Sequence, residues 1–490
     1  MTNFRRSIAH PTVLIWITLA FLFLGGALTL TLFSSRFGYD YRIVEMPVLW
    51  LAGGLIAAGL IYQALPYMVL QASTKQPQHS NRILIIIIAA GLGMRVLLLA
   101  SEPTLEDDYQ RYLWDGAVTA HGISPYKFSP SAAIKGTAAT PELERLVTES
   151  GQIVHRVNHP DLRTIYPPVA QGVFAFVHWI APWSLTGWRF SILAFEIVSL
   201  ALIIQILIST GRSPLWSALY WWNPVVIKEL FNSAHMEAIL VPLVLGALLL
   251  AIKKRFISSA FFCALAAGTK IWPVLLLPLL LRPLCRSPRA LALPVIIFSA
   301  VCLLAAIPVL LAGLDQSSGF VAYAQKWQTN SALTPALDGF IRSLLETANL
   351  GGEWSSLLTR ICLGVILLMF VIFMSIRDVR DPHDLIARAG LIAAATLLLS
   401  PAQFPWYFLW VAPFLPILPL FGLTALTATL PLYYTAFHYQ SFGNFETFKT
   451  TIAWLIWSPA WCLLTVDFLL SRLRRHSRIG APAHTAGDTG

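Results

Sequence analysis

The residues best suited to chemistry form an acidic cluster that follows the third long apolar run of the chain. Glu106, Asp107 and Asp108 are consecutive, and Arg111 and Asp115 follow them at helical spacing. Adjacent carboxylates at a membrane boundary repel each other, which raises the pKa of one of them unless a cation compensates. Such a group suits a general base or a divalent-cation ligand. Asp107 and Asp108 are therefore candidate catalytic residues and candidate ligands of Mg²⁺ or Mn²⁺, although the pattern demands no cofactor.

The same cluster predicts a short helix at the membrane surface. Pro103 can start this helix and Gly116 can end it, so we expect it to span residues 104–115. One face would then carry two carboxylates around a guanidinium, from Asp108, Arg111, Tyr112 and Asp115. The alternative interpretation is a solvated amphipathic helix with internal ion pairs.

Polar and aromatic residues elsewhere in the chain interrupt apolar sequence and extend the candidate site. Ionisable groups at membrane depth are costly and are functional candidates by default. Besides Arg111, the candidate binding residues are Tyr166, His235, Glu237, Lys270, Trp406 and Tyr407. Each has a structural alternative. His235 and Glu237 are two residues apart and would point to different sides of a helix, Lys270 can extend to the interface, and the aromatic residues can form an interfacial belt.

The chain that positions these residues has the composition of a polytopic membrane protein. Of its 490 residues, 57% are hydrophobic and only 12% are charged, about half the charged fraction of a soluble domain. Apolar runs of about twenty residues recur along the chain. Its basic residues fall in short clusters between these runs, as is typical of cytoplasmic anchors, so we expect a lipid bilayer and no nucleic acid as partner.

We predict an all-α integral membrane protein with about 11 to 14 transmembrane helices. The expected spans are residues 13–33, 47–70, 83–100, 188–209, 236–252, 290–313, 358–376, 386–400, 404–421, 422–437 and 451–470. Segments 167–182 and 214–229 are shorter and can be tilted or partial spans. Basic clusters flank both ends of 256–281, which suggests a re-entrant pair of half-helices around Lys270, with a single kinked span as the alternative.

Charge divides the chain into parts. These are three N-terminal spans (1–100), a polar outer loop with nine acidic and six basic side chains (101–165), a multi-span core (166–470) and a polar cytoplasmic tail (471–490). Arg5 and Arg6 precede a first apolar run of about span length, so we expect a retained helix with a cytoplasmic N-terminus. The acidic loop then emerges on the periplasmic side of a bacterial inner membrane.

Six motifs occur in an order that resembles a known superfamily. They are "EDDYQRYLWDG", "GISPY", "YPP", "WNPVVIKELFNSAHMEA", "GTKIWPVLLLP" and "SPAQFPWY". In this order they resemble the GT-C superfamily of polytopic glycosyltransferases. They are most similar to its bacterial branch related to the GPI mannosyltransferases and polyprenyl-phosphate-mannose-dependent enzymes. The resemblance covers about residues 95–420.

The resemblance implies a function and roles for the candidate residues. The implied function is the transfer of a hexose, with mannose favoured, from a polyprenyl-phosphate sugar with inversion at the anomeric carbon. The acceptor is a hydroxyl of a glycolipid, polysaccharide or protein on the outer face. The family's acidic residue falls on Asp107 or Asp108, although the chain has Glu-Asp-Asp where several relatives have Asp-x-Asp. From the chemistry of such a transfer, we further hypothesise that Asp107 or Asp108 is the general base, that Lys270, His235 or Arg111 lies near the lipid phosphate, and that Tyr166, Trp406 and Tyr407 contact the sugar or lipid.

A transporter or flippase of the cell envelope is the alternative function. Such a protein would also carry charges within its spans. It would predict broken helices at matching positions in two halves of the chain, and the sequence has no such internal match.

Overall fold

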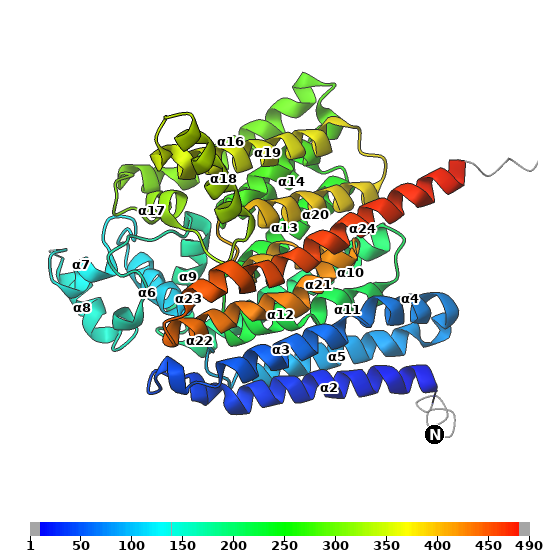
Figure 1. Cartoon of the computed structure of the whole chain (residues 1–490), viewed down its shortest axis with the longest axis horizontal. Helices are drawn as coiled ribbons and strands as arrows, with labels where there is room; N and C mark the ends of the chain where they lie inside the picture. Colours follow the sequence, from blue (N-terminus) through cyan, green and yellow to red (C-terminus); the bar gives the residue numbers. More distant parts are fainter. Residues whose placement is uncertain (1–9, 139, 480–490) are drawn as a thin grey trace, which may run out of the picture.

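The computed structural model describes residues 10–138 and 140–479, and side chains up to Leu473, and within these ranges every regular element is helical. The long helices lie side by side along the longest axis of the molecule (Figure 1). The one β-type contact among these residues is an isolated bridge between Thr329 and Ala402. The predicted all-α class is therefore confirmed. Arg5, Arg6 and residues 480–490 of the predicted tail lie outside the described residues.

Eight described helical segments are long and apolar enough to cross a membrane. They are formed by α2 (Pro11–Phe33), α3 (Val48–Tyr62) with α4 (Leu65–Lys75), α5 (Ser80–Leu98), α10 (Leu185–Ser209), α16 (Pro288–Leu311), α19 (Ser355–Ile376), α20 (Pro382–Leu399) and α24 (Ala453–Ile479). Three shorter apolar helices are α9 (Pro168–Ile180), α13 (Glu237–Ile252) and α14 (Phe256–Ala267). The protein is thus a polytopic membrane protein, and the exact number of crossings stays a prediction.

The remaining helices are short and gather mainly at one end of the bundle. They are α6 (Asp108–Ala120), α7 (Pro130–Ile134), α8 (Pro141–Glu149), α11 (Ala218–Trp221), α12 (Pro224–Ile227), α15 (Leu277–Leu280), α17 (Gly319–Lys326), α18 (Leu333–Thr347), α21 (Phe421–Thr429), α22 (Thr435–Ser441) and α23 (Phe445–Thr447). Helices α6, α7, α8 and α17 lie at the left end in Figure 1, whereas α4 and the end of α24 lie at the right. The acidic loop and the basic connection after α4 are therefore at opposite ends of the molecule.

The predicted span at 404–421 is wrong. This stretch forms two buried 3₁₀ segments, Pro405–Trp410 and Ala412–Phe414, and no α-helix crosses there. Four prolines, at positions 405, 413, 416 and 419, remove backbone N–H donors and clash with the preceding turn of an α-helix. The aromatic side chains of 404–410 are consequently held inside the protein and do not face lipid.

The segment 256–281 turns back on itself, as the re-entrant interpretation predicts. Helix α14 ends at Ala267, and the chain reverses through Gly268 and Lys270 into the 3₁₀ turn Trp272–Leu276. The Cys263 thiol donates to the carbonyl of Pro273, ten residues later, with the two atoms 3.3 Å apart. In a continuous helix these positions would be about 15 Å apart, so a single kinked span is excluded.

Helix α6 begins and ends later than its sequence predicts. It starts at Asp108 and continues through Gly116 to Ala120, where Gly122 adopts a φ of +74° in the turn that ends it. The N–H of Ile123 donates back to the Val118 carbonyl at 3.1 Å, which satisfies an end carbonyl. Gly116 does not end the helix. It instead allows α6 to pack closely against α9, since a Cβ at this position would lie 2.6 Å from the Phe174 carbonyl oxygen of α9.

We predict that Gly116→Ala destabilises the protein by about 1–3 kcal/mol, because the added methyl forces α6 away from α9. A thermal unfolding measurement in detergent checks this. Gly172→Ala in α9 is the matched control, since nothing lies within 4 Å of a Cβ at that position. Equal melting temperatures for the two variants would contradict the close packing.

Candidate functional site

A cavity of about 990 Å³ opens beneath the acidic loop. Its walls come from the segment before α6, from α6 itself, from the break after α14, from α17, α19 and the 3₁₀ segment Pro405–Trp410. Eight of the nine candidate residues line it, namely Asp107, Asp108, Arg111, Tyr166, Glu237, Lys270, Trp406 and Tyr407. The ninth, His235, lies behind Trp406, and their rings stack with centroids 4.1 Å apart. Residues from distant parts of the sequence thus meet in one place.

The Asp107 and Asp108 carboxylates are joined by one amide. Asn158 Nδ2 donates to Asp107 Oδ1 at 2.9 Å and to Asp108 Oδ1 at 2.8 Å. Burial raises the pKa of Asp107 to about 6, and the neighbouring Asp108 charge adds to this rise. Burial also raises the pKa of Asp108, against the lowering effect of its hydrogen bond from Asn158. Both carboxyls are therefore stronger bases than carboxyls in water.

Asp108 lines the cavity and is held there by neighbouring side chains. Its Oδ2 accepts a hydrogen bond from the Tyr166 hydroxyl at 3.4 Å and lies 3.8 Å from His235 Nδ1. The Tyr166 ring packs edge to face against Tyr112 of α6, with centroids 5.1 Å apart. Asp108 is thus held by neighbours from three segments while it remains open to the cavity.

Lys270 points into the cavity from the reversal after α14. Its Nζ bonds Glu237 Oε1 at 2.6 Å and lies 4.1 Å from the centre of the Tyr407 ring. Its side chain is 22% exposed and that of Glu237 is 1% exposed. The Lys270 ammonium is therefore paired inside the protein, and it is the part of this ion pair that a ligand can reach.

Trp406 and Tyr407 form an aromatic wall of the cavity. They are 7% and 4% exposed, so an interfacial belt facing lipid is wrong for these two residues. The Tyr407 hydroxyl lies 2.8 Å from that of Tyr323 in α17. Such a wall offers ring faces and hydroxyl groups, which suit the apolar faces and hydroxyls of a sugar.

Arg111 is satisfied by the protein itself. Its Nε bonds Asp115 Oδ1 at 2.9 Å and its NH2 donates to the Leu162 carbonyl at 3.0 Å. The expected pairing with Asp115 is confirmed, but Asp108 turns instead to Asn158 and Tyr166. The helix is also largely buried from Tyr109 to Val118, so it is not a solvated surface helix.

Arg360 is a lining residue that sequence reasoning missed. It lies on α19, and its guanidinium donates to the Trp327 carbonyl at 3.2 Å. Within the described part of the chain it forms no ion pair with a carboxylate. A single arginine in an apolar run is also typical of an interfacial anchor, so the sequence alone does not mark Arg360 as a binding residue.

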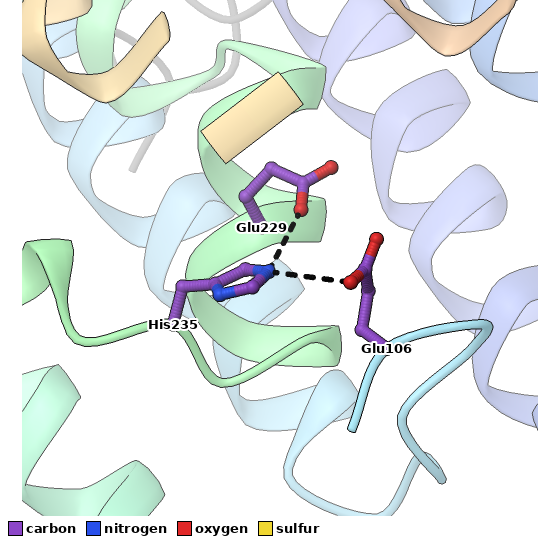
Figure 2. A group of neighbouring side chains, drawn as sticks. All are labelled: Glu106, Glu229 and His235. Carbon is purple, nitrogen blue, oxygen red and sulfur yellow. Dashed lines mark ion pairs between the residues drawn. The ribbon is translucent and has the colours of Figure 1, made fainter. Parts of the chain in front are cut away.

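A second cluster lies next to Asp108. His235 Nε2 is 3.5 Å from Glu229 Oε2 and 3.9 Å from Glu106 Oε2, and Figure 2 shows both carboxylates facing that nitrogen. Glu229 comes from the π-helical turn Lys228–Asn232. Their three ligand atoms lie within 4.8 Å of one another. Neither Asp107 nor Asp108, the predicted ligand pair, belongs to this group.

Comparisons with known proteins point to sugar transfer. A family model described as Alpha-(1->6)-mannopyranosyltransferase, N-terminal domain, matches residues 23–285. The chain is also similar to Alpha-(1->6)-mannopyranosyltransferase A of Corynebacterium glutamicum, with 27% identity over 195 residues that cover 38% of this chain and 36% of that protein. The chain thus covers well under two thirds of this curated relative. No solved structure matches it.

The region matched by the family model supplies more than half of the residues that line the cavity. It includes the acidic cluster, Tyr166, His235 and Lys270, whereas Arg360, Trp406 and Tyr407 come from the remainder of the chain.

Proposed function

The chain belongs to the alpha-(1->6)-mannopyranosyltransferase family, and we propose that it moves mannose from a polyprenyl-phosphate sugar to an acceptor hydroxyl. The acceptor is carried by a glycolipid, polysaccharide or protein. The observation that carries this proposal is the cavity, which is lined by both a basic carboxylate, Asp108, and a reachable cation, Lys270.

We place this reaction on the periplasmic side of a bacterial inner membrane. Basic connections follow α4, α13, α15 and α19, whereas the loop above the cavity is acidic. Cytoplasmic loops of membrane proteins carry an excess of Lys and Arg. A donor that is held by an isoprenoid tail keeps its sugar at headgroup level, and we place the mouth of the cavity at that level.

Asp108 acts as the general base. The acceptor hydroxyl gives its proton to the Asp108 carboxylate as its oxygen bonds to the anomeric carbon. The bond from that carbon to the phosphate oxygen breaks, and the electron pair leaves with polyprenyl phosphate. Attack from the side opposite the phosphate inverts the anomeric centre, so an α-linked product requires a β-linked donor.

Lys270 and Arg360 stabilise the leaving phosphate. Both are cations on the cavity wall, and charge that develops on a leaving group is best stabilised by fixed cations in a site shielded from water. Leu363, Gly364 and Leu367 of α19 continue the wall beyond Arg360 and offer an apolar path to the isoprenoid tail. Tyr166, Trp406 and Tyr407 face the sugar.

We predict that Arg360→Met raises the KM for the donor about tenfold, which corresponds to the loss of one charge-assisted hydrogen bond. Steady-state kinetics with varied donor concentration check this. Arg342→Met in α18 is the matched control, because Arg342 is 52% exposed and pairs only weakly with Asp338. An unchanged KM for Arg360→Met would remove this residue from the phosphate site.

The proposed function is tested with the purified chain in proteoliposomes. The donor, polyprenyl-phosphate mannose labelled in the sugar, is added to the proteoliposome membrane, and octyl α-mannoside is supplied as the acceptor. Protein-free liposomes serve as the control. We expect a labelled dimannoside that α-mannosidase digests, together with free polyprenyl phosphate. If the intact donor instead crosses the bilayer without loss of its sugar, the protein is a flippase and the proposal fails.

A further inference from the structure

We propose that Glu106, Glu229 and His235 bind one divalent transition-metal ion beside the cavity. Ligands that share one ion at about 2.0–2.3 Å lie about 3–4.5 Å from each other. His235 Nε2 is 3.5 Å from Glu229 Oε2 and 3.9 Å from Glu106 Oε2. These separations are too long for hydrogen bonds and suit three atoms around a common ion.

The three side chains carry buried atoms that no protein group satisfies. His235 Nε2, Glu229 Oε2 and Glu106 Oε1 are buried and have no hydrogen-bond partner. The His235 and Glu229 side chains are 0% and 2% exposed. An unpaired buried polar atom is costly, and here Nε2 and Oε2 are directed toward each other (Figure 2). One cation between them would satisfy both.

Charge also leaves room for a cation. Lys270 and Glu237 neutralise each other, which leaves one ammonium, Lys228, against four neighbouring carboxylates: Glu106, Asp107, Asp108 and Glu229. The Lys228 ammonium lies 3.6 Å from the other Glu229 oxygen, Oε1, and donates to Ser233 and Tyr434. It therefore does not bond to Glu229 Oε2 or His235 Nε2. A divalent ion there would offset most of the remaining negative charge.

The other side of the His235 ring has the surroundings of a metal ligand. Nδ1 lies 3.4 Å from the Tyr112 hydroxyl and 3.8 Å from Asp108 Oδ2. Histidines that bind metals commonly direct their second nitrogen to such a group, which fixes the tautomer with Nδ1 protonated and Nε2 free. Stacking on Trp406 holds the plane of the ring.

The ligand set selects the kind of ion. One imidazole with two carboxylates suits Mn²⁺, Fe²⁺ or Zn²⁺ better than Mg²⁺ or Ca²⁺, which prefer oxygen ligands alone. Glu106 lines the cavity, so further positions on the ion can be reached from it. This site differs from the Asp107–Asp108 pair that the sequence suggests, and it does not depend on mannosyl transfer.

The test measures metal binding by the full-length purified chain without substrate. After treatment with EDTA, Mn²⁺ is titrated and bound ion is counted by EPR and by elemental analysis. We expect about one ion per chain, with an electron spin echo signal from one histidine nitrogen. Glu106→Gln and Glu229→Gln should each weaken binding at least tenfold, and His235→Gln should remove the nitrogen signal.

Glu102→Gln is the matched control, because Glu102 is an exposed acid in the same loop, and it should bind Mn²⁺ as the wild type does. Melting temperatures with and without Mn²⁺ show that each variant is folded. Glu106→Gln, on the loop, is the variant least disruptive to the membrane core. Wild-type protein without bound Mn²⁺, or equal affinity in Glu106→Gln and wild type, would overturn the proposal in favour of a proton shared by the three groups.

Discussion

Asp108→Asn should lower kcat for mannosyl transfer by about 10²–10⁴-fold, the usual contribution of a general base. The amide has nearly the same shape as the carboxylate but accepts no proton from the acceptor hydroxyl. Its remaining oxygen can still accept the Asn158 hydrogen bond, and its NH2 group, in place of Oδ2, can donate to the Tyr166 hydroxyl oxygen. The change should therefore leave the fold and the KM for the donor close to their native values. Single-turnover kinetics with labelled donor measure the effect on the chemical step.

Two further variants make this result specific. Asp107→Asn should lower kcat less than Asp108→Asn does, because Asp107 shares the Asn158 amide but lacks the contacts of Asp108 with Tyr166 and His235. Asp161→Asn is the matched control, since Asp161 is an 81% exposed acid in the same loop, and it should transfer at the native rate. Native rates in both Asp107→Asn and Asp108→Asn would show that neither aspartate is the base.

Lys270→Met should lower kcat by about 10²–10³-fold, because the phosphate would leave without its nearest cation. The methionine keeps most of the length of the side chain and removes the ammonium. Lys270→Arg should restore part of the rate, since it returns a cation to the same wall. Lys127→Met, an exposed lysine of the outer loop, is the matched control and should have no effect.

A purely structural role for Lys270 can be separated from this one. Loss of Lys270 also leaves Glu237 buried without its partner, which by itself is destabilising. The double variant Lys270→Met with Glu237→Gln removes that penalty. If the double variant regains the native rate, Lys270 serves only to neutralise Glu237, and its assignment to the phosphate is wrong.

The architecture of the bundle is largely encoded in local sequence. Long apolar runs such as 13–33 and 188–209 predict helices that the structure confirms as Pro11–Phe33 and Leu185–Ser209, because a run of that length in lipid can only satisfy its backbone as a helix. The prediction of a helical span at 404–421 is wrong because its prolines prevent an α-helix. Its non-helical backbone is tolerated because protein, and not lipid, surrounds it.

The candidate site is encoded by residue type, but its pairings are not. Polar groups in apolar sequence are costly, so residues such as Lys270 and Tyr166 stand out and prove to line the cavity. Asn158 lies 50 residues beyond Asp108 in a polar loop, where asparagines are common, so the sequence does not predict its hydrogen bond to Asp108. Glu106 and Glu229 meet only because the segment before α6 folds against the turn Lys228–Asn232. Contacts of this range depend on tertiary packing.

A cryo-EM structure of the Asp108→Asn variant with bound polyprenyl-phosphate mannose would test the proposed mechanism most directly. We expect the phosphate within hydrogen-bonding distance of Lys270 Nζ, the isoprenoid tail along α19, and the anomeric carbon with its face opposite the phosphate open toward residue 108. A donor bound outside this cavity, or one whose phosphate lies between the sugar and residue 108, would contradict it.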